Sequence, residues 1–427
     1  MNQILRALGV VGVFCLATVA WLVLGAVMTT RTGSQSSELR GKVADLWGQP
    51  HAQAGPAFGF EWTTPKDVSR METTHGVERQ VVEHTLEAHQ QDVSIASTRV
   101  AADLHLDQRL KGLMWYSLYD VAFRGGWTYV HAAPIAGDLR IRFKFPDPAG
   151  VYDGFRFVVD GQPHDLRPQN GEVQLVTPVQ PGQKVDLAVQ YKSRGMDEWR
   201  YVVDPNVANL KDFELAMTTD FAEFDFPPST LSPSTRERTA SGWKLVWAFQ
   251  QVVTGHSIGI STPQRIQPGQ LAAALSFSAP VSLLFFFLLV LVLGRLRGLD
   301  IHPINYLFLA AAFFAFHLLF AYSVDHVTIG VAFALSSAVS IFLVVSYLRL
   351  VVSPRFAFVE AALAQLVYLV GFSLAHFWDG FTGLTVTVLS IVTLFLLMQM
   401  TGRIRWSGGL SPRPTSRPMP DAAGAAG

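Results

Sequence analysis

The sequence predicts a membrane α-helical protein with one N-terminal and five C-terminal transmembrane helices and a large, mainly β, sandwich-like domain outside the cytoplasm. Three observations predict this class. One apolar run of about 22 residues opens the chain, five runs of similar length fill its last third, and the region between them alternates apolar and polar residues over short segments. Hydrophobic residues make up 50% of the chain and charged residues 15%, a balance typical of membrane proteins.

The first apolar run covers residues 7–28, behind Arg6, and is long enough to cross a bilayer. We interpret it as an uncleaved anchor, the alternative being a cleaved signal peptide, whose apolar core is usually only about 7 to 15 residues. Residues 38–47 continue this helix beyond the membrane. The single cysteine, Cys15, lies inside the run, so the β domain has neither an internal disulfide nor a thiolate metal site.

Residues 29–270 form the exported β domain, because charges return there and Gly and Pro punctuate short alternating segments. Turn residues separate the strands, for example Asp160-Gly161 and Pro181-Gly182. We expect antiparallel pairing, an irregular loop over residues 227–238 and a last strand around residues 243–249. The clearest strand candidates cover residues 139–145, 154–159, 172–177, 185–191 and 199–203.

The C-terminal bundle covers residues 271–402, and short loops make consecutive helices antiparallel neighbours. Small residues spaced four apart at Ala332, Ser336 and Ser340, and an alanine cluster around Ala312, predict that the third and fourth helices pack face to face. From residue 403 the tail is rich in Pro, Ser, Arg, Gly and Ala, which predicts disorder. The five predicted helices cover residues 271–294, 303–322, 329–348, 357–377 and 381–401.

Arginine placement predicts the orientation, since basic residues in short loops stay on the cytoplasmic side. Arg295, Arg297, Arg349 and Arg355 lie in one set of connections, whereas the alternate loops at residues 323–328 and 376–380 carry no Lys or Arg. Both termini are therefore expected in the cytoplasm and residues 29–270 outside it.

No catalytic motif is complete in its expected context. Residues 255–259 have the GxSxG spacing, but Pro263 follows shortly after and no helix is expected there, so they do not form a nucleophile elbow. The sequence has no phosphate-binding GxxxxGK[ST] and no HExxH. We therefore expect a protein that is not an enzyme and that needs no cofactor. The 33 basic residues balance the 33 acidic ones, which gives no reason to expect nucleic acid as a partner.

A polar stretch in the β domain contains residue types that can bind a metal. The spacing matches no ligand rule, so a solvated surface is the preferred interpretation and no metal site is predicted. The residues are His75, Glu83, His84, Glu87, His89 and Asp92.

Glu360 is the one acidic residue within the predicted membrane helices. A carboxylate inside a membrane is costly and suggests a proton or ion path or a buried partner. Because it lies about one turn inside the fifth helix, we favour an anchoring role in which it reaches the interface or pairs with Arg355.

His317, in the outer half of the third helix, is the second candidate, together with polar residues of the two outer hairpins. Such a group could form a site at the rim of the bundle that titrates near neutral pH or holds a metal. Helix capping and contact with water are the more ordinary explanation. The hairpin residues are Asp325, His326, His376 and Asp379.

The start of the third helix carries a motif, His302-Pro303-Ile304-Asn305-Tyr306-Leu307, and the helix is followed by Ser323-Val324-Asp325-His326. Both segments resemble the CreD-type inner-membrane proteins of bacteria, a cell envelope integrity family with a His-Pro-x-x-Tyr-Leu motif and a Ser-Glu-His hairpin. Residues 109–113 and 118–121 are similar to a strand pair of that family, and the order of anchor, β domain and five helices matches along nearly the whole chain. The chain departs from the family in its inserted Val324, which indicates a divergent member. The family has no established catalytic residues to carry over.

The resemblance implies a multi-pass protein of the bacterial inner membrane, with residues 29–270 in the periplasm, and a stress-related role. Together with the missing catalytic signatures it leads to the hypothesis of a non-enzymatic protein that supports envelope integrity or stress tolerance. On this hypothesis the lipid bilayer holds the bundle and the β domain binds an envelope protein, a lipid or a peptidoglycan-related partner. Two alternatives stay open: a transporter or channel component using Glu360 and His317, and a sensor subunit coupled to a cytoplasmic kinase.

Overall fold

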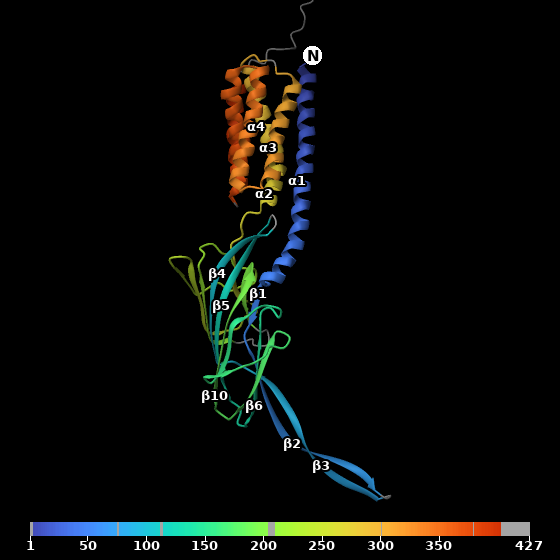
Figure 1. The fold of residues 1–427 in the computed structure, drawn as a ribbon, viewed down its shortest axis with the longest axis vertical. Helices are drawn as coiled ribbons and strands as arrows, with labels where there is room; N and C mark the ends of the chain where they lie inside the picture. The colour runs from blue at the N-terminus through green and yellow to red at the C-terminus, as the bar shows by residue number, and fades with distance from the viewer. Residues whose placement is uncertain are drawn as a thin grey trace, which may run out of the picture. The chain divides into compact units, whose positions relative to one another are not determined.

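The computed structural model of the chain describes residues 3–74, 77–111, 114–203, 210–299, 301–378 and 380–402. These residues divide into two compact units. Residues 29–270 form one unit, here called the β unit, and the described residues up to Met28 and from Leu271 form the other, the helical unit (Figure 1). The long helix α1 (Gln3–Trp47) contributes its first part to the helical unit and its last part to the β unit.

The β unit contains three sheets. The largest has eight strands in the order β13-β14-β12-β4-β5-β10-β7-β8, the second has the order β3-β2-β6-β9, and the third has the order β1-β11-β15. The strands are β1 (His51–Ala54), β2 (Ala57–Thr74), β3 (Val77–Val93), β4 (Ser97–Lys111), β5 (Met114–Val130), β6 (Gly137–Lys144), β7 (Asp153–Val159), β8 (Gln162–His164), β9 (Glu172–Val179), β10 (Lys184–Met196), β11 (Glu198–Val202), β12 (Leu210–Thr219), β13 (Thr235–Arg238), β14 (Trp243–Val252) and β15 (Ile258–Ser261).

All five strand candidates from the sequence are confirmed, as β6, β7, β9, β10 and β11. The turn at Asp160-Gly161 joins β7 to β8 with positive φ at both residues, 50° and 79°, which suits a two-residue hairpin loop. Pairing is antiparallel except at two places, since β1 runs parallel to β11 and β12 runs parallel to β4. The expectation of antiparallel pairing is therefore wrong for these two pairs.

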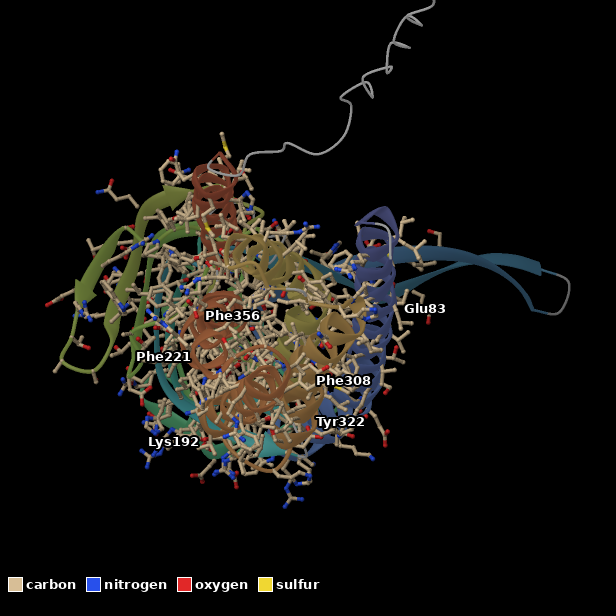
Figure 2. The ribbon with its side chains drawn as sticks, turned by 90° about the horizontal axis from the view of Figure 1, so that it is seen from above. Glu83, Lys192, Phe221, Phe308, Tyr322 and Phe356 are labelled. Carbon is tan, nitrogen blue, oxygen red and sulfur yellow. The ribbon has the colours of Figure 1, made fainter. Side chains whose placement is uncertain are left out.

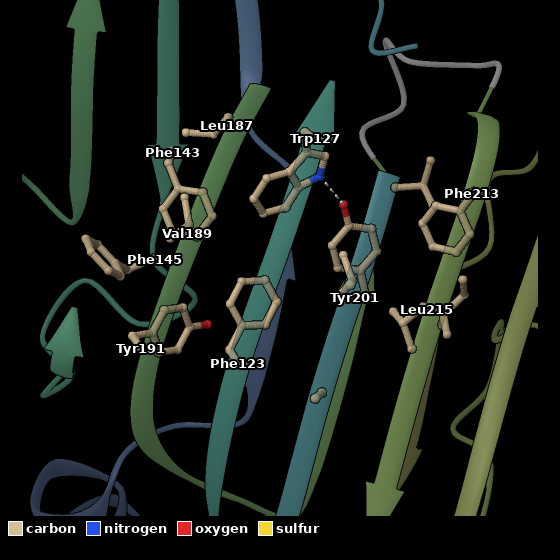
Figure 3. Close-up of a cluster of buried hydrophobic side chains, with 14 of the residues drawn as sticks. Phe123, Trp127, Phe143, Phe145, Leu187, Val189, Tyr191, Tyr201, Phe213 and Leu215 are labelled. Atoms are coloured by element: carbon tan, nitrogen blue, oxygen red, sulfur yellow. Dashed lines mark hydrogen bonds between the residues drawn. The ribbon is translucent and has the colours of Figure 1, made fainter. Parts of the chain in front are cut away.

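An aromatic core lies between the eight-stranded and the four-stranded sheets (Figure 3). Phe123 and Trp127 of β5 meet Phe143 of β6, with ring centroids 6.4 and 6.0 Å apart. The indole of Trp127 donates a hydrogen bond to the hydroxyl oxygen of Tyr201 at 3.4 Å. These rings are all nearly fully buried, so hydrophobic packing holds a domain in which no disulfide is available.

The last turns of α1 pack on the opposite face of the large sheet. Val43 and Ala44 are buried against Leu118 of β5 and Met196 of β10, with Trp47 partly buried beside them. The predicted continuation of the first helix through residues 38–47 is thus confirmed. Its apolar positions recur three and four residues apart, which is why one side of this polar segment can cover the sheet.

Strands β2 and β3 form a long two-stranded hairpin, here called the arm, that extends from the rest of the β unit (Figure 1). β6 pairs with β2 only from Ala57 to Glu61, so beyond that point the two strands have only each other. Every residue from Thr63 to Ser69 is exposed. The sequence did not predict this hairpin.

The helical unit contains α2 (Pro268–Leu296), α3 (Pro303–Ser323), α4 (Ile329–Val351), a fifth helix over Phe356–Phe377 and α7 (Thr382–Thr401). With α1, six helices of the described residues are long and apolar enough to cross a membrane, as in a multi-pass membrane protein. The predicted bounds of the five C-terminal runs agree with these helices to within a few residues. The tail from residue 403, predicted to be disordered, lies outside the described residues.

α3 and α4 pack face to face, as the small residues predicted. Ala332, Ser336 and Ser340 are fully buried, and the hydroxyl of Ser340 donates to the carbonyl oxygen of Ala312 at 2.7 Å. The fifth helix has π-helical turns, η1 (Phe356–Ala361) and η2 (Leu366–Gly371), on either side of the short α-helical α5 (Ala362–Gln365), and it continues through α6 (Phe372–Leu374) to the 3-10 turn η3 (Ala375–Phe377).

Candidate functional site

An open groove of about 1100 Å³ lies on the face of the large sheet that the end of α1 partly covers. Its walls are residues 44–49, from the end of α1, and residues of the loop between β6 and β7 around Asp147 and Asp153. Residues of β4, β5, β10 and the end of β12 form the floor.

Strand register explains why these floor residues meet. Lys192 of β10 lies opposite Ala122 of β5, which lies opposite Asp103 of β4, and Asp103 lies opposite Thr218 of β12. Two residues further along, Arg194 lies opposite Asp120, which in turn lies opposite His105. Side chains alternate between the two faces of a strand, so both rows point away from the aromatic core.

The charge of the groove is predominantly acidic. Ion pairs join Arg194 to Asp120 at 3.0 Å, Arg124 to Asp103 at 2.5 Å, and His105 to Asp220. Lys192 and Arg194 are the only Lys or Arg in the lining, against six aspartates. The aspartates are Asp45, Asp103, Asp120, Asp147, Asp153 and Asp220.

Trp47 provides an aromatic wall at the end of α1. The Arg109 guanidinium lies 3.9 Å from the centroid of its ring, and that of Arg194 lies 5.5 Å away. Both cations are thus placed to interact with the negative face of the indole. The acidic groups of the groove, rather than the tryptophan, have the chemistry to bind a positively charged partner.

The same face of the sheet carries a smaller hollow of about 480 Å³ with the opposite charge. Arg156 of β7 lies opposite Gln190 of β10, which lies opposite Arg124 of β5, and Arg99 of β4 is in the next row. This face is thus divided into an acidic groove and an arginine-lined hollow.

A buried polar cluster lies at the start of β1. His51 is 1% exposed, and neither ring nitrogen has a hydrogen-bond partner in the described structure. Burial lowers the pKa of His51 to about 4, an effect opposed by the nearby Asp147 carboxylate. The backbone N–H of His51 donates to the hydroxyl oxygen of Tyr119 at 3.3 Å, and that hydroxyl donates to the carbonyl oxygen of Glu198 at 2.7 Å.

The cluster continues to Gln53, whose side-chain oxygen accepts a hydrogen bond from the Tyr191 hydroxyl at 2.6 Å. The hydroxyl of Tyr152 donates to the backbone oxygen of Asp147 at 2.6 Å, and burial raises the pKa of Tyr152. These bonds fix β1 and the 147–153 wall of the groove. The cluster thus positions the groove and holds His51 in its neutral form.

A second polar cluster lies inside the helical unit. The side-chain amide of Gln365 donates to the Ser340 hydroxyl oxygen at 2.7 Å, and both residues are fully buried. The carbonyl oxygen of Gln365 and the hydroxyl of Ser336 have no hydrogen-bond partner among the described atoms. Buried polar groups are normally satisfied, and π-helical turns such as those beside Gln365 are frequent at functional sites.

Glu360 is paired with Arg297, which follows α2, and not with Arg355. The sequence left two anchoring arrangements open for Glu360, contact with the interface or pairing with Arg355, and the second does not occur in the described structure. Arg355 precedes Glu360 on the same helix, whereas Arg297 reaches it from the turn after α2, through a contact that only the fold creates. Glu360 thus has a basic partner, but a different one.

His317 is buried within α3, and its Nδ1 lies 3.0 Å from the carbonyl oxygen of Phe313. The rings of Trp21 and Phe316 pack on its imidazole. No three His, Cys, Asp or Glu side chains gather in a metal-binding arrangement within the described part of the chain. Asp379 of the proposed rim lies outside it.

The remaining rim candidates lie at helix ends. The backbone N–H of His326 donates to the Ser323 oxygen at 3.0 Å, in the turn that also contains Asp325. The 3-10 turn that ends the fifth helix contains His376, which is partly buried.

The residues of the third-helix motif have structural roles. His302 caps α3, with Nδ1 accepting from the Ile304 N–H at 3.4 Å, and Pro303 occupies the first turn, where its missing N–H costs little. Tyr306 is buried against Phe287, with ring centroids 5.1 Å apart.

The described histidines of the polar stretch, for which a solvated surface was the preferred interpretation, lie on the arm. His84 pairs with Asp67 at 2.5 Å, and His89 stacks on Trp62 while contacting the Thr64 hydroxyl at 2.7 Å. Both are on β3 and serve cross-strand contacts. His75 lies outside the described residues.

Sequence reasoning missed the groove, the His51 cluster and the Ser340–Gln365 cluster. The groove residues come from strands far apart in the sequence, so no local motif marks them. Gln365 carried a usable signal, because a Gln inside an apolar run of membrane length is rare enough to be noted.

Comparisons with known proteins leave the family open. No family model and no curated protein matches the chain. Among solved structures, a putative nutrient binding protein from Legionella pneumophila aligns at 9% identity and a TM-score of 0.30, covering 56% of this chain and 76% of that one. An M1 zinc metallopeptidase from Deinococcus radiodurans aligns at 11% identity and a TM-score of 0.23, covering 77% and 96%. Similarities this low carry no inference about the fold or the activity of this chain.

Proposed function

We propose that this protein is a non-enzymatic binding protein of the bacterial inner membrane that supports cell envelope integrity. In this proposal the helical unit anchors it in the lipid bilayer with both termini in the cytoplasm, and the β unit binds an envelope partner in the periplasm. The arginine distribution and the resemblance to CreD-type proteins support the location. The acidic groove is the single observation that supports the binding role.

The groove favours a partner with positive charge. Its lining has six aspartates and only two Lys or Arg, and three of those aspartates, Asp45, Asp147 and Asp153, form no ion pair within the described structure. Opposite charge steers association and selects partners, so a basic segment of an envelope protein is the proposed occupant.

Charge reversal tests this proposal. Asp45→Lys with Asp153→Lys replaces two negative charges of the groove by two positive ones, and Arg156→Glu reverses a charge in the neighbouring hollow as a control. In a deletion strain, we expect the control to restore tolerance to detergents and envelope-active antibiotics and the double variant to fail. Equal complementation by both variants, at equal membrane abundance, would exclude the groove as the binding site.

In-cell photocrosslinking adds a direct readout. A photoreactive residue at Thr218 in the groove should give an adduct that one at Val176, exposed on β9, does not give. The adduct should disappear in the Asp45→Lys, Asp153→Lys variant. A deletion strain with unaltered stress tolerance would contradict the envelope role.

A transporter or channel component is the second candidate, and the unpartnered Ser336 and Gln365 groups in the helical unit favour it. Buried polar groups in membrane helices commonly line solute or ion paths. Gln365→Leu, Glu360→Gln and His317→Ala should each reduce a flux measured in proteoliposomes if this function is correct. Unchanged flux in all three would reject it.

A further inference from the structure

The outer edge of β3 along the arm pairs with no other strand of the described β unit. β3 is the edge strand of its sheet, and its register with β2 runs without a bulge from Phe58↔Val93 to Thr74↔Val77. A two-stranded ribbon is marginally stable in water, and a long flat edge presents unpaired N–H and C=O groups to another strand.

The two edges of the arm differ in protection. β2 carries Pro65 and Lys66 on its exposed part, and these residue types block strand addition because Pro has no N–H and Lys brings a charge. β3 contains neither Pro nor Lys, and its charges in the exposed part are the glutamates Glu83 and Glu87. On the face that carries Pro65, β3 instead presents Leu86, directly opposite and 70% exposed, and Val82, 47% exposed.

We propose that the β3 edge pairs antiparallel with the β3 edge of a second copy of this chain, with the two-fold axis at Leu86. The two arms then form one four-stranded sheet in the order β2-β3-β3-β2. An interface of this kind is isologous, so the same edge must complement itself.

Two requirements select the pairing register: like charges must not face each other, and each side chain must stay on its own face of the sheet. Under a two-fold axis normal to the sheet, one residue of β3 faces its own copy across the axis, and each register is named here by that residue. Axes at Glu83, Thr85 or Glu87 place a glutamate opposite a glutamate, which is destabilising. An axis at Leu86 places Glu83 opposite His89 of the second copy and brings the two Leu86 side chains together.

Neighbouring registers lack this combination. An axis at His84 sets two histidines against each other and leaves Glu83 opposite Thr85. An axis at Ala88 leaves Leu86 opposite Gln90 and brings it into no apolar pair. Of the registers compared, only the one at Leu86 sets Glu83 opposite His89, which can hydrogen-bond, and also buries Leu86, the most exposed large apolar side chain among residues 57–69 and 82–93.

Disulfide crosslinking in native membranes tests the proposal. The chain has a single cysteine, Cys15, so Cys15→Ser gives a cysteine-free background. Leu86→Cys is the test variant, and Pro65→Cys, exposed on the same face of the adjacent strand, is its matched control. In the paired arms the two Leu86 Cα atoms are about 4.5 to 5.5 Å apart, within disulfide reach, whereas the two Pro65 positions are three strand spacings, roughly 14 Å, apart.

We expect mild oxidation to convert most of the Leu86→Cys protein into a disulfide-linked dimer and to leave Pro65→Cys monomeric. Differently tagged Glu83→Cys and His89→Cys chains expressed together should crosslink to each other and not to themselves. Leu86→Glu, which sets two carboxylates together, should shift the protein from dimer to monomer in native mass measurements.

Three outcomes would overturn the proposal. Equal crosslinking at residues 86 and 65 would indicate random collision, and a monomer under all conditions would exclude self-pairing. A disulfide adduct between Leu86→Cys and another protein would show that the β3 edge receives a different partner.

Discussion

Glu360 of the fifth helix and Arg297, in the turn that follows α2, form an ion pair within the helical unit, 63 positions apart in the sequence. The Glu360 side chain is 13% exposed and that of Arg297 is 50% exposed. One partner is thus largely withdrawn from water while the other can still contact it. An unpaired charge at the Glu360 position would be costly, which gives this pair a structural role.

Charge exchange should identify the partner of Glu360. Arg297→Glu places two carboxylates together and should destabilise the protein by about 1 kcal/mol or more in detergent, and adding Glu360→Arg should restore most of that loss. Arg355→Glu is the control and should have a smaller effect. The measurement is the thermal unfolding midpoint of each variant. A larger effect at Arg355 than at Arg297 would favour the pairing predicted from sequence.

The contact between α3 and α4 should depend on Ser340. Ser340→Ala removes both the bond to the Ala312 carbonyl and the acceptor of the Gln365 amide, which should cost about 0.5 to 2 kcal/mol. Ser346→Ala, which removes a hydroxyl bonded only to Leu343 of its own helix, should change stability by less than about 0.5 kcal/mol. Equal effects in detergent unfolding would contradict this packing.

Gly125 is required because the Trp127 ring occupies the space beside it. A Cβ at Gly125 would lie 2.1 Å from the indole, whereas one at the adjacent Gly126 would have its nearest neighbour at 3.8 Å. Gly125→Ala should therefore displace a buried tryptophan and destabilise the β unit by about 2 kcal/mol or more. Gly126→Ala should be close to neutral or stabilising. Denaturant titrations followed by tryptophan fluorescence measure both.

Stability of the β unit should fall as the pH is lowered from about 6.5 towards 4. Burial holds the pKa of His51 at about 4, below its ordinary value of 6.5, so in this window the unfolded chain binds a proton that the folded protein does not. The contribution of neutral His51 to the free energy of unfolding is complete above pH 6.5. Between pH 6.5 and 4 it decreases by roughly 3 kcal/mol at most.

Replacement of His51 provides the test. His51→Gln should flatten the dependence of the unfolding free energy on pH between 4 and 6.5, and His256→Gln, at an exposed position, should leave it unchanged. An unaltered pH slope in His51→Gln would mean that His51 is not buried in its neutral form.

The sequence alone was sufficient for the six apolar helices, the position of the β region and five of its strands. Apolar runs of bilayer length and alternation between turn residues are local patterns, and each element satisfies them within its own segment. One tertiary contact, the packing of α3 against α4, was also predicted. The spacing of four residues places Ala332, Ser336 and Ser340 on one helix face.

Only the tertiary structure decided the groove, the partner of Glu360 and the environment of His51. Lys192, Asp103 and Thr218 meet through the register of four strands, and Arg297 meets Glu360 through helix packing. The arm escaped prediction for a related reason: its exposed part faces water on both sides, so its sequence lacks the apolar alternation that burial of one face imposes. These contacts arise from the whole fold, and no local pattern of the kind that marked the α3–α4 contact encodes them.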